Sequence, residues 1–139
     1  MIPGIQEANA ASLTWSGILG SVLYGGVIEE VMLRFFVMSL IAWIIWKVFC
    51  RKRKKEEIPE SVFVIANVTA ALLFAASHLP ATYTIFGEVT PLLLFRCFLL
   101  NGGFAMIFGW LYRKYGIAYA MMSHALFHAV SKLIWLIFI

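Results

Sequence analysis

Six ionisable side chains stand inside the apolar runs of this chain, where a lipid bilayer would exclude them. In chain order they are Glu29, Glu30, Arg34, His78, His124 and His128. The set contains all three histidines of the sequence and two of its seven acidic residues. A charge at the centre of a bilayer costs roughly 2.5–3.5 kcal/mol even on insertion scales, so each is a candidate functional residue. Carboxylates and imidazoles together can activate water, stabilise an oxyanion or bind a metal ion.

The first group, Glu29, Glu30 and Arg34, contains one pair and one carboxylate left over. Glu30 and Arg34 are four residues apart, so on a helix they share a face and can form an ion pair. Glu29 is rotated by about 100° from Glu30 and points elsewhere. An unpaired carboxylate suits a general base. A purely structural salt bridge explains Glu30 and Arg34 equally well, but it leaves Glu29 without a role.

The three histidines occupy positions where an imidazole can serve structure or chemistry. His78 ends the second apolar run, just before Pro80. His124 and His128 are four residues apart and share one helix face, a spacing that serves metal ligation as well as paired hydrogen-bond donation. The structural alternative makes His78 an interfacial residue and the pair a polar seam between helices.

The composition around these residues is that of an integral membrane protein. Of 139 residues, 63% are hydrophobic and 13% charged, and the mean hydropathy is +0.91. Soluble domains contain about 45–50% apolar and about 25% charged residues. One small soluble core could not hide this much apolar surface, so lipid must cover it. We expect a single bundle over residues 1–139, and without strand-type alternation a transmembrane barrel is excluded.

Hydrophobic segments of about 20 residues, the length that a bilayer requires, predict an all-α, polytopic transmembrane helix bundle with about four spans. The first apolar stretch is too long for one span, and the Gly25–Gly26 pair inside it predicts a break or a kink. A short preceding or re-entrant helix is therefore expected before the first span. The expected segments are the short helix 13–24 and the spans 27–48, 61–79, 92–112 and 117–139.

Basic residues predict the orientation of the bundle in the cell membrane. The run 51–55, within the loop 50–59, accounts for the net charge of +4, and Arg113 and Lys114 occupy the alternate loop. The positive-inside rule places both loops in the cytoplasm. Contact with lipid headgroups explains the basic run, and no nucleic-acid partner is expected. At about 1.5 Å per helical residue, Glu29 and the three histidines lie in the half of the bilayer remote from these loops.

Three motifs follow one another on separate predicted helices, and together they resemble a known family. They are Glu29-Glu30-x-x-x-Arg34, Phe74-x-x-x-His78 and His124-x-x-x-His128. The successive motifs EExxxR, FxxxH and HxxxN or HxxxD of the CAAX-protease and bacteriocin-processing (CPBP, or Abi) family of intramembrane proteases have this order. The resemblance covers about residues 29–128. This chain departs from the pattern at His128, where the family usually has Asn or Asp, and it is short for the family.

The resemblance implies hydrolysis of a peptide bond within the membrane by a metal-independent glutamic protease. Glu29 would activate a water molecule, with His78 helping to hold it. Glu30 and Arg34 would support the site. His124 and the residue at 128 would stabilise the tetrahedral oxyanion. The substrate would be a membrane-associated peptide or protein, and it could be a prenylated CAAX protein, a bacteriocin or a sorting signal. The resemblance does not indicate an oligomeric state.

Other interpretations of the same residues remain open. Glu29, His78, His124 and His128 could form a zinc site, since catalytic zinc takes three protein ligands and a water; the metal-free interpretation needs no cofactor. A non-catalytic membrane adaptor or immunity protein would keep the polar cluster for structure or partner binding. A small proton-coupled transporter is disfavoured, because four spans show no inverted repeat.

Overall fold

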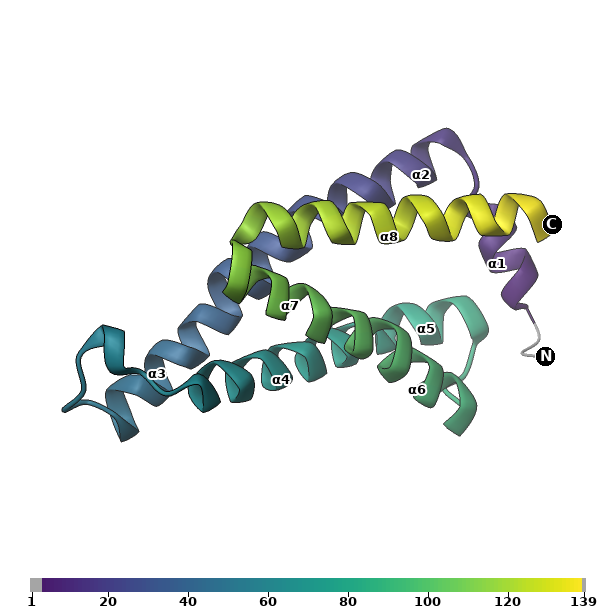
Figure 1. The fold of residues 1–139 in the computed structure, drawn as a ribbon. Coiled ribbons are helices and arrows are strands. Elements are labelled where there is room, and N and C mark those ends of the chain that lie inside the picture. Colours follow the sequence, from purple (N-terminus) through teal and green to yellow (C-terminus); the bar gives the residue numbers. More distant parts are fainter. Residues whose placement is uncertain (1–3, 139) are drawn as a thin grey trace.

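The computed structural model describes residues 4–138, and within them the chain forms helices and no strands (Figure 1). In chain order the helices are α1 (Ile5–Ala11), α2 (Trp15–Gly20), the π-helical η1 (Ser21–Glu29) and η2 (Val31–Met38), α3 (Ser39–Phe49), the 3₁₀ turn η3 (Lys55–Glu57), α4 (Glu60–Ser77), α5 (Leu79–Phe86), α6 (Pro91–Cys97), the π-helical η4 (Phe98–Gly102), α7 (Gly103–Tyr115) and α8 (Ile117–Phe138). The predicted all-α fold is confirmed.

Consecutive helices join into four rods that are long and apolar enough to cross a membrane. Their bounds are Trp15–Phe49, Glu60–Phe86, Pro91–Tyr115 and Ile117–Ile137. Only 11–39% of the residues in the most apolar part of each rod are buried inside the protein. Most of the apolar surface therefore faces outward, as lipid contact requires, and the chain is a multi-pass membrane protein. Residue 139, the predicted end of the last span, lies outside the described residues.

The Gly25–Gly26 pair does not break the helix, so this part of the prediction is wrong. The helical rod runs on from α2 through η1 and η2 into α3, and the expected segment 13–24 falls largely within its first part. Both glycines are buried against α8, where a Cβ on Gly26 would lie 2.7 Å from the Cβ of Ala125. The glycines serve the close approach of two helices. The short helix before the first span is α1.

The second rod also differs from the prediction, because Pro80 does not end it. α4 ends at Ser77, and α5 begins one residue after His78 with Pro80 in its first turn. Proline is tolerated there, since the N–H that it lacks would have no helical partner. The connection expected after the span 61–79 begins instead at Gly87, which ends α5 in the left-handed conformation with φ of 74°.

Small side chains let α4 pack closely against the third rod. Ala66, Ala70 and Ala75 of α4 are completely buried. On the facing side, a Cβ on Gly102 would lie 3.5 Å from the Cβ of Ala75, and one on Gly109 would collide with the side-chain oxygen of Asn67. Close packing of this kind replaces the hydrophobic effect as the force between helices in lipid.

Figure 1 shows two layers, one formed by α8 with the first half of the first rod and the other by α4–α5 with α6–α7. The layers separate toward the C-terminal end of α8, where α1 lies. Two neighbours place α1 there. Gly4, just before α1, lies so close to the Phe86 ring of α5 that an added Cβ would be in van der Waals contact with it. Lys132 of α8 donates hydrogen bonds to Ser12, just after α1.

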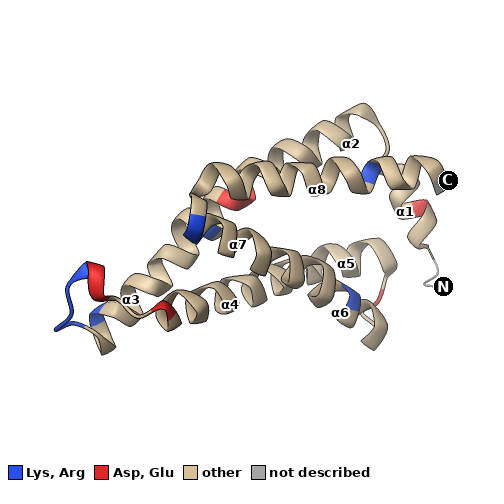
Figure 2. Cartoon of the chain, viewed as in Figure 1, with Lys and Arg blue, Asp and Glu red and all other residues tan. Residues whose placement is uncertain are grey.

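The basic loops lie at the same end of the second layer. Figure 2 shows Lys and Arg gathered in the loop that joins α3 to α4. Arg113, at the end of α7, forms an ion pair of 3.3 Å with Glu60, the first residue of α4, and stacks on Phe63 with 4.0 Å between its guanidinium carbon and the ring centre. Two loops that alternate along the chain are thereby brought together, as the four-span prediction requires.

Candidate functional site

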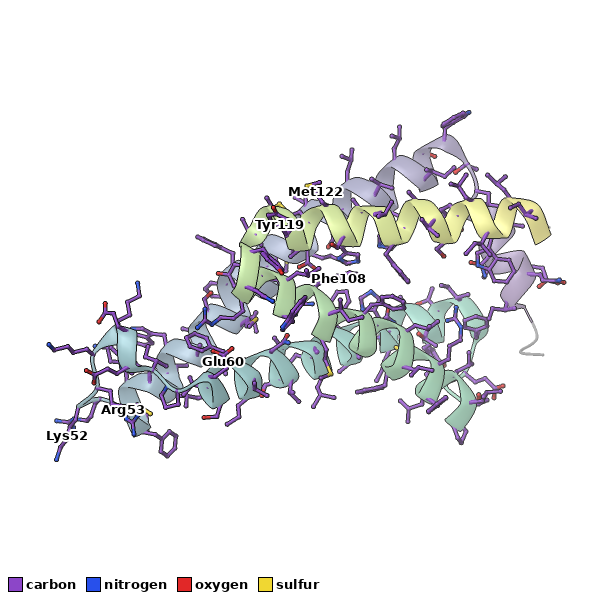
Figure 3. The ribbon with its side chains drawn as sticks, in the orientation of Figure 1. Lys52, Arg53, Glu60, Phe108, Tyr119 and Met122 are labelled. Carbon is purple, nitrogen blue, oxygen red and sulfur yellow. The ribbon has the colours of Figure 1, made fainter. Side chains whose placement is uncertain are left out.

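A cavity of about 180 Å³ opens between the four rods, and four of the six predicted site residues line it. These residues are Glu29, His78, His124 and His128. They come from the first, second and fourth rods, and aromatic side chains such as Phe108 complete the wall. Figure 3 shows Phe108 between α7 and α8. The other two predicted residues, Glu30 and Arg34, are buried beside the cavity with exposed fractions of 1% and 0%.

Glu30 is bound on both sides. Its Oε2 accepts a hydrogen bond from Nε of Arg34 at 3.1 Å, so the predicted ion pair forms. Its Oε1 lies 2.9 Å from Nδ1 of His124, in α8. The sequence did not predict this second contact, because the two residues are 94 positions apart. Glu30 thus links the cation of its own helix to the histidine of another, and both of its oxygens are occupied.

Glu29 has a different environment, although it is the next residue. Its side chain is 18% exposed and lines the cavity, and its Oε2 lies 3.8 Å from Nε2 of His124. One carboxylate is therefore fixed in the protein interior and its neighbour faces the cavity. This division matches the one expected from the helical rotation between the two residues.

His124 is held in one orientation by its contacts. A carboxylate oxygen only accepts hydrogen bonds, so Nδ1 carries a proton toward Glu30, and Nε2 points toward Glu29. Phe108 stacks on one side of the imidazole with a centroid distance of 4.6 Å. His128 stacks on it as well, at 4.9 Å and an interplanar angle of 18°. A ring held in this way presents a fixed nitrogen to the cavity.

His78 is oriented by the backbone of its own helix. Its Nδ1 lies 2.9 Å from the carbonyl oxygen of Phe74, which can only accept, so Nδ1 is the protonated nitrogen. In the neutral ring Nε2 then remains free to accept a hydrogen bond. The Phe74 ring meets His78 edge-on at 4.5 Å and His124 at 6.0 Å. The Phe-x-x-x-His spacing thus places one aromatic ring between two histidines of different helices.

Gly25 makes room for the histidine pair, a role that the sequence interpretation missed. A Cβ at this position would overlap Nε2 of His128, and it would lie 2.7 Å from Cδ2 of His128 and 3.4 Å from Nε2 of His124. The chain at residue 25 must therefore be glycine for α8 to bring both imidazoles to the first rod.

Asn101 is a second residue that the sequence interpretation missed. It lines the cavity from η4, and its amide nitrogen donates a hydrogen bond to the sulfur of Cys97 at 3.4 Å. The signal was present in the sequence, because an amide inside the apolar run Leu99-Leu100-Asn101 is costly in lipid unless it has a partner. With Asn101, all four rods contribute polar groups to the cavity.

Three of the four residues considered for zinc lie close enough to share an ion. Glu29, His124 and His128 each offer a ligand atom, and these atoms lie within 4.8 Å of one another. His78 does not belong to this group in the described part of the chain. The Glu30 carboxylate, which accepts a hydrogen bond from Nδ1 of His124, resembles the carboxylate that commonly orients a metal-bound histidine. The donor set therefore fits zinc as well as metal-free chemistry.

Four apolar spans around a carboxylate–histidine cavity define a polytopic membrane protein with a site among its helices. A family model described as type II CAAX prenyl endopeptidase Rce1-like matches residues 11–130, most of the chain and all three motifs. The chain therefore belongs to the Rce1-like family, and the resemblance to CPBP proteases is confirmed. Membership makes it a CAAX-type membrane protease that acts on membrane-associated substrates. No curated protein sequence and no solved structure matches the chain.

Proposed function

We propose that the protein is an intramembrane endopeptidase whose cavity hydrolyses a peptide bond through a water activated by Glu29, without a metal. The environment of the two neighbouring glutamates supports this proposal most directly. Both oxygens of Glu30 are engaged by Arg34 and His124, whereas Glu29 faces the cavity. A carboxylate that faces the reaction space can take a proton, and one that is locked in a buried network cannot easily do so.

In the first step a water molecule lies between Glu29 and His78, which line the same cavity. One water proton passes to the carboxylate of Glu29, and Nε2 of His78 accepts a hydrogen bond from the other. The water oxygen then forms a bond to the carbonyl carbon of the substrate, and the carbonyl π electrons move to oxygen. His78 holds the nucleophile, since its Nδ1 proton is already engaged by the Phe74 carbonyl.

The resulting oxyanion needs donors, and the stacked pair His124 and His128 supplies them. His124 donates from Nε2 when both of its ring nitrogens carry protons, and the negative charge of Glu30, 2.9 Å from Nδ1, balances that form. His128 donates one hydrogen bond from a neutral ring, in place of the amide that the family usually has there. Collapse of the intermediate breaks the C–N bond, and Glu29 returns its proton to the leaving nitrogen. One product ends in a carboxyl group and the other in an amine.

Zinc hydrolysis is a second candidate mechanism, because the grouping of Glu29, His124 and His128 within 4.8 Å supports it. In that case these three residues would hold the ion, which would supply Lewis-acid activation of water and carbonyl. His78 would keep its place at the cavity wall and would still accept a hydrogen bond from the nucleophile.

We propose further that the loops 50–59 and 113–114 face the cytoplasm and that the cavity opens in the opposite half of the membrane. The Arg113–Glu60 ion pair supports a common side for the two loops, and the positive-inside rule supports the choice of side. With Cys97 replaced by serine, the native Cys50 at the start of loop 50–59 should react with an impermeant thiol reagent only after the cytoplasmic face is opened.

The decisive test compares wild type with Glu29→Gln in liposomes, using a library of prenylated CAAX-type and unmodified membrane-proximal peptides. We expect Glu29→Gln to fold, because glutamine has nearly the same shape and the Glu29 carboxylate approaches His124 only at 3.8 Å, and to lose cleavage by at least about 10²-fold, as removal of a general base does. Glu56→Gln, an exposed residue of the basic loop, is the matched control and should cleave like wild type. A folded Glu29→Gln protein that cleaves normally would favour the adaptor interpretation, in which the cluster has no chemical role.

A further inference from the structure

A second cavity lies at the end of the bundle that carries the basic loops, between α3, α4 and α7. Its outer part has a volume of about 510 Å³ and its inner part about 250 Å³, and both parts are lined by Ser39, Ala42, Phe63 and Arg113. It shares none of its lining residues with the cavity that holds Glu29 and the histidines. Along the first rod, Ser39 lies about 15 Å from Glu29, at 1.5 Å per residue. This second cavity, here called the α3 groove, is therefore a separate site.

The walls of the α3 groove are largely apolar and aromatic. The wall that α3 contributes consists of residues at helical spacing, Ser39, Ala42, Trp43 and Trp46. Phe63 of α4 adds a third aromatic ring. The polar groups at the inner end are paired with each other, since the hydroxyls of Ser39 and Tyr112 lie 2.9 Å apart. An apolar chain can therefore enter the groove without depriving these hydroxyls of a partner.

Trp46 places the mouth of the α3 groove at the membrane surface. Its indole nitrogen donates a hydrogen bond to the carbonyl oxygen of Arg53 at 3.2 Å, and the Lys47 ammonium lies 4.6 Å from its ring centre. A tryptophan with an apolar body and a hydrogen-bonded N–H is typical of the boundary between hydrocarbon and headgroups. Ser39 lies about 10 Å from Trp46 along the helix. The groove thus runs from the headgroup level toward the bilayer interior.

Two cations line the mouth, and both can still bind an anion. Lys55 has no carboxylate oxygen within 4.0 Å among the described residues. Arg113 pairs with Glu60 through one nitrogen at 3.3 Å, but a guanidinium has five N–H donors. The loops 50–59 and 113–114 together contain seven basic and two acidic side chains. The field at the mouth is therefore positive, although Glu56 also lines it.

We propose that the α3 groove binds an anionic phospholipid of the surrounding bilayer, with the phosphate at Lys55 and Arg113 and an acyl chain along the aromatic walls. Basic pockets between transmembrane helices bind anionic headgroups in this way. A soluble anion would leave the apolar walls unused, and a zwitterionic lipid would bring a cation of its own toward the mouth. The bound lipid joins α3, α4 and α7 away from the candidate active site, so the inference does not depend on the proposed function.

The test measures lipid binding to the full chain by quenching of tryptophan fluorescence. A protein carrying Trp15→Phe, Trp110→Phe and Trp135→Phe keeps only Trp43 and Trp46, which line the groove. It is placed in phosphatidylcholine vesicles that contain an increasing fraction of lipid with brominated acyl chains, either phosphatidylglycerol or phosphatidylcholine. Lipids in general contact with the helices quench in proportion to their fraction, whereas a lipid in a specific site saturates at a low fraction.

We expect brominated phosphatidylglycerol to reach half-maximal quenching at a fraction at least about tenfold lower than brominated phosphatidylcholine, because two cations near a membrane surface attract it. Lys55→Gln/Arg113→Gln should lose this preference. Arg51→Gln/Lys52→Gln removes the same charge from residues that do not line the groove and should keep it. Figure 3 shows Lys52 at the outer tip of the loop.

Glu60→Gln controls for packing, because Arg113→Gln also breaks the ion pair with Glu60. This control breaks the same pair but leaves the cation, so it should keep the preference. Thermal unfolding followed by circular dichroism checks that each variant is folded.

Four results would overturn the inference. Equal quenching by the two lipids, or a preference that survives in Lys55→Gln/Arg113→Gln, would remove the site. An equal loss in Arg51→Gln/Lys52→Gln would reduce the effect to diffuse attraction by the basic run. Displacement of the lipid by an equal concentration of glycerol phosphate would mean that the acyl chain contributes nothing. Peptide cleavage is measured in none of these experiments, so failure of the proposed function is seen separately.

Discussion

Replacing Gly25 with alanine should damage the site while leaving the helix that carries it intact. The added Cβ would overlap Nε2 of His128 and lie 2.7 Å from its Cδ2. Carbon atoms are in favourable contact at about 3.5–4.0 Å, so the His128 ring must retreat by at least about 0.8 Å, the difference between 3.5 Å and the 2.7 Å to Cδ2, and Nε2 lies closer still. The ring is stacked on His124 at 4.9 Å, so this retreat also disturbs the second proposed oxyanion donor.

A displacement of about 1 Å at a reacting group costs on the order of 10²-fold in rate. For Gly25→Ala we therefore expect a loss of about 10- to 100-fold in kcat for peptide cleavage in liposomes. Gly20→Ala is the matched control, because it lies on the same rod and a Cβ there would meet nothing within 4 Å. Alanine is favoured over glycine inside a helix by about 0.5–1 kcal/mol, so this control should be active and slightly more stable.

A double-mutant cycle separates the proposed cause from a general loss of packing. In a His128→Ala background the ring that collides with the new Cβ is gone, so Gly25→Ala should reduce activity little further. Thermal unfolding in detergent, followed by circular dichroism, checks that each variant remains folded. If Gly25→Ala cleaves as fast as Gly20→Ala, or reduces activity equally with and without His128, then the role assigned to Gly25 is refuted.

Three more predictions address the other parts of the site. His128→Asn restores the residue usual in the family and should retain cleavage within about fivefold of wild type, because an amide also donates one hydrogen bond. His128→Leu, which cannot donate, should lose about 10²-fold. Equal cleavage rates of the Asn and Leu variants would remove His128 from the mechanism. Arg34→Met should lower the free energy of unfolding by about 3–5 kcal/mol, as breaking a buried ion pair does, and chemical unfolding measures this change. A change below about 1 kcal/mol would show that His124 alone balances the charge of Glu30. Prolonged dialysis against a strong chelator should leave cleavage unchanged if the mechanism is metal-free, and a loss that zinc restores would establish the zinc site at Glu29 and the histidine pair.

Local spacing was sufficient for the features that depend on one helix. The cost of burying charge in lipid singled out the six ionisable residues, and the i to i+4 spacing predicted the ion pair between Glu30 and Arg34 that the structure contains. Hydropathy predicted an all-α bundle with four spans, and the motif order indicated the family. For the ion pair and the spans the deciding quantity, angle per residue or hydrophobicity per residue, is a property of neighbouring positions, whereas the family was indicated by the resemblance of the three motifs in their order.

The features that depend on how helices meet were decided only by the tertiary structure. The bond from Glu30 to His124 joins residues 94 positions apart, and the register of α8 against the first rod sets it. The same register explains why Gly25 and Gly26, predicted as a break, lie in an uninterrupted rod: their missing side chains accommodate His128 and Ala125. Helix contacts in lipid depend on the fit of small side chains across the interface. A sequence fixes which residues share a helix face, but the packing of all four rods determines what that face touches.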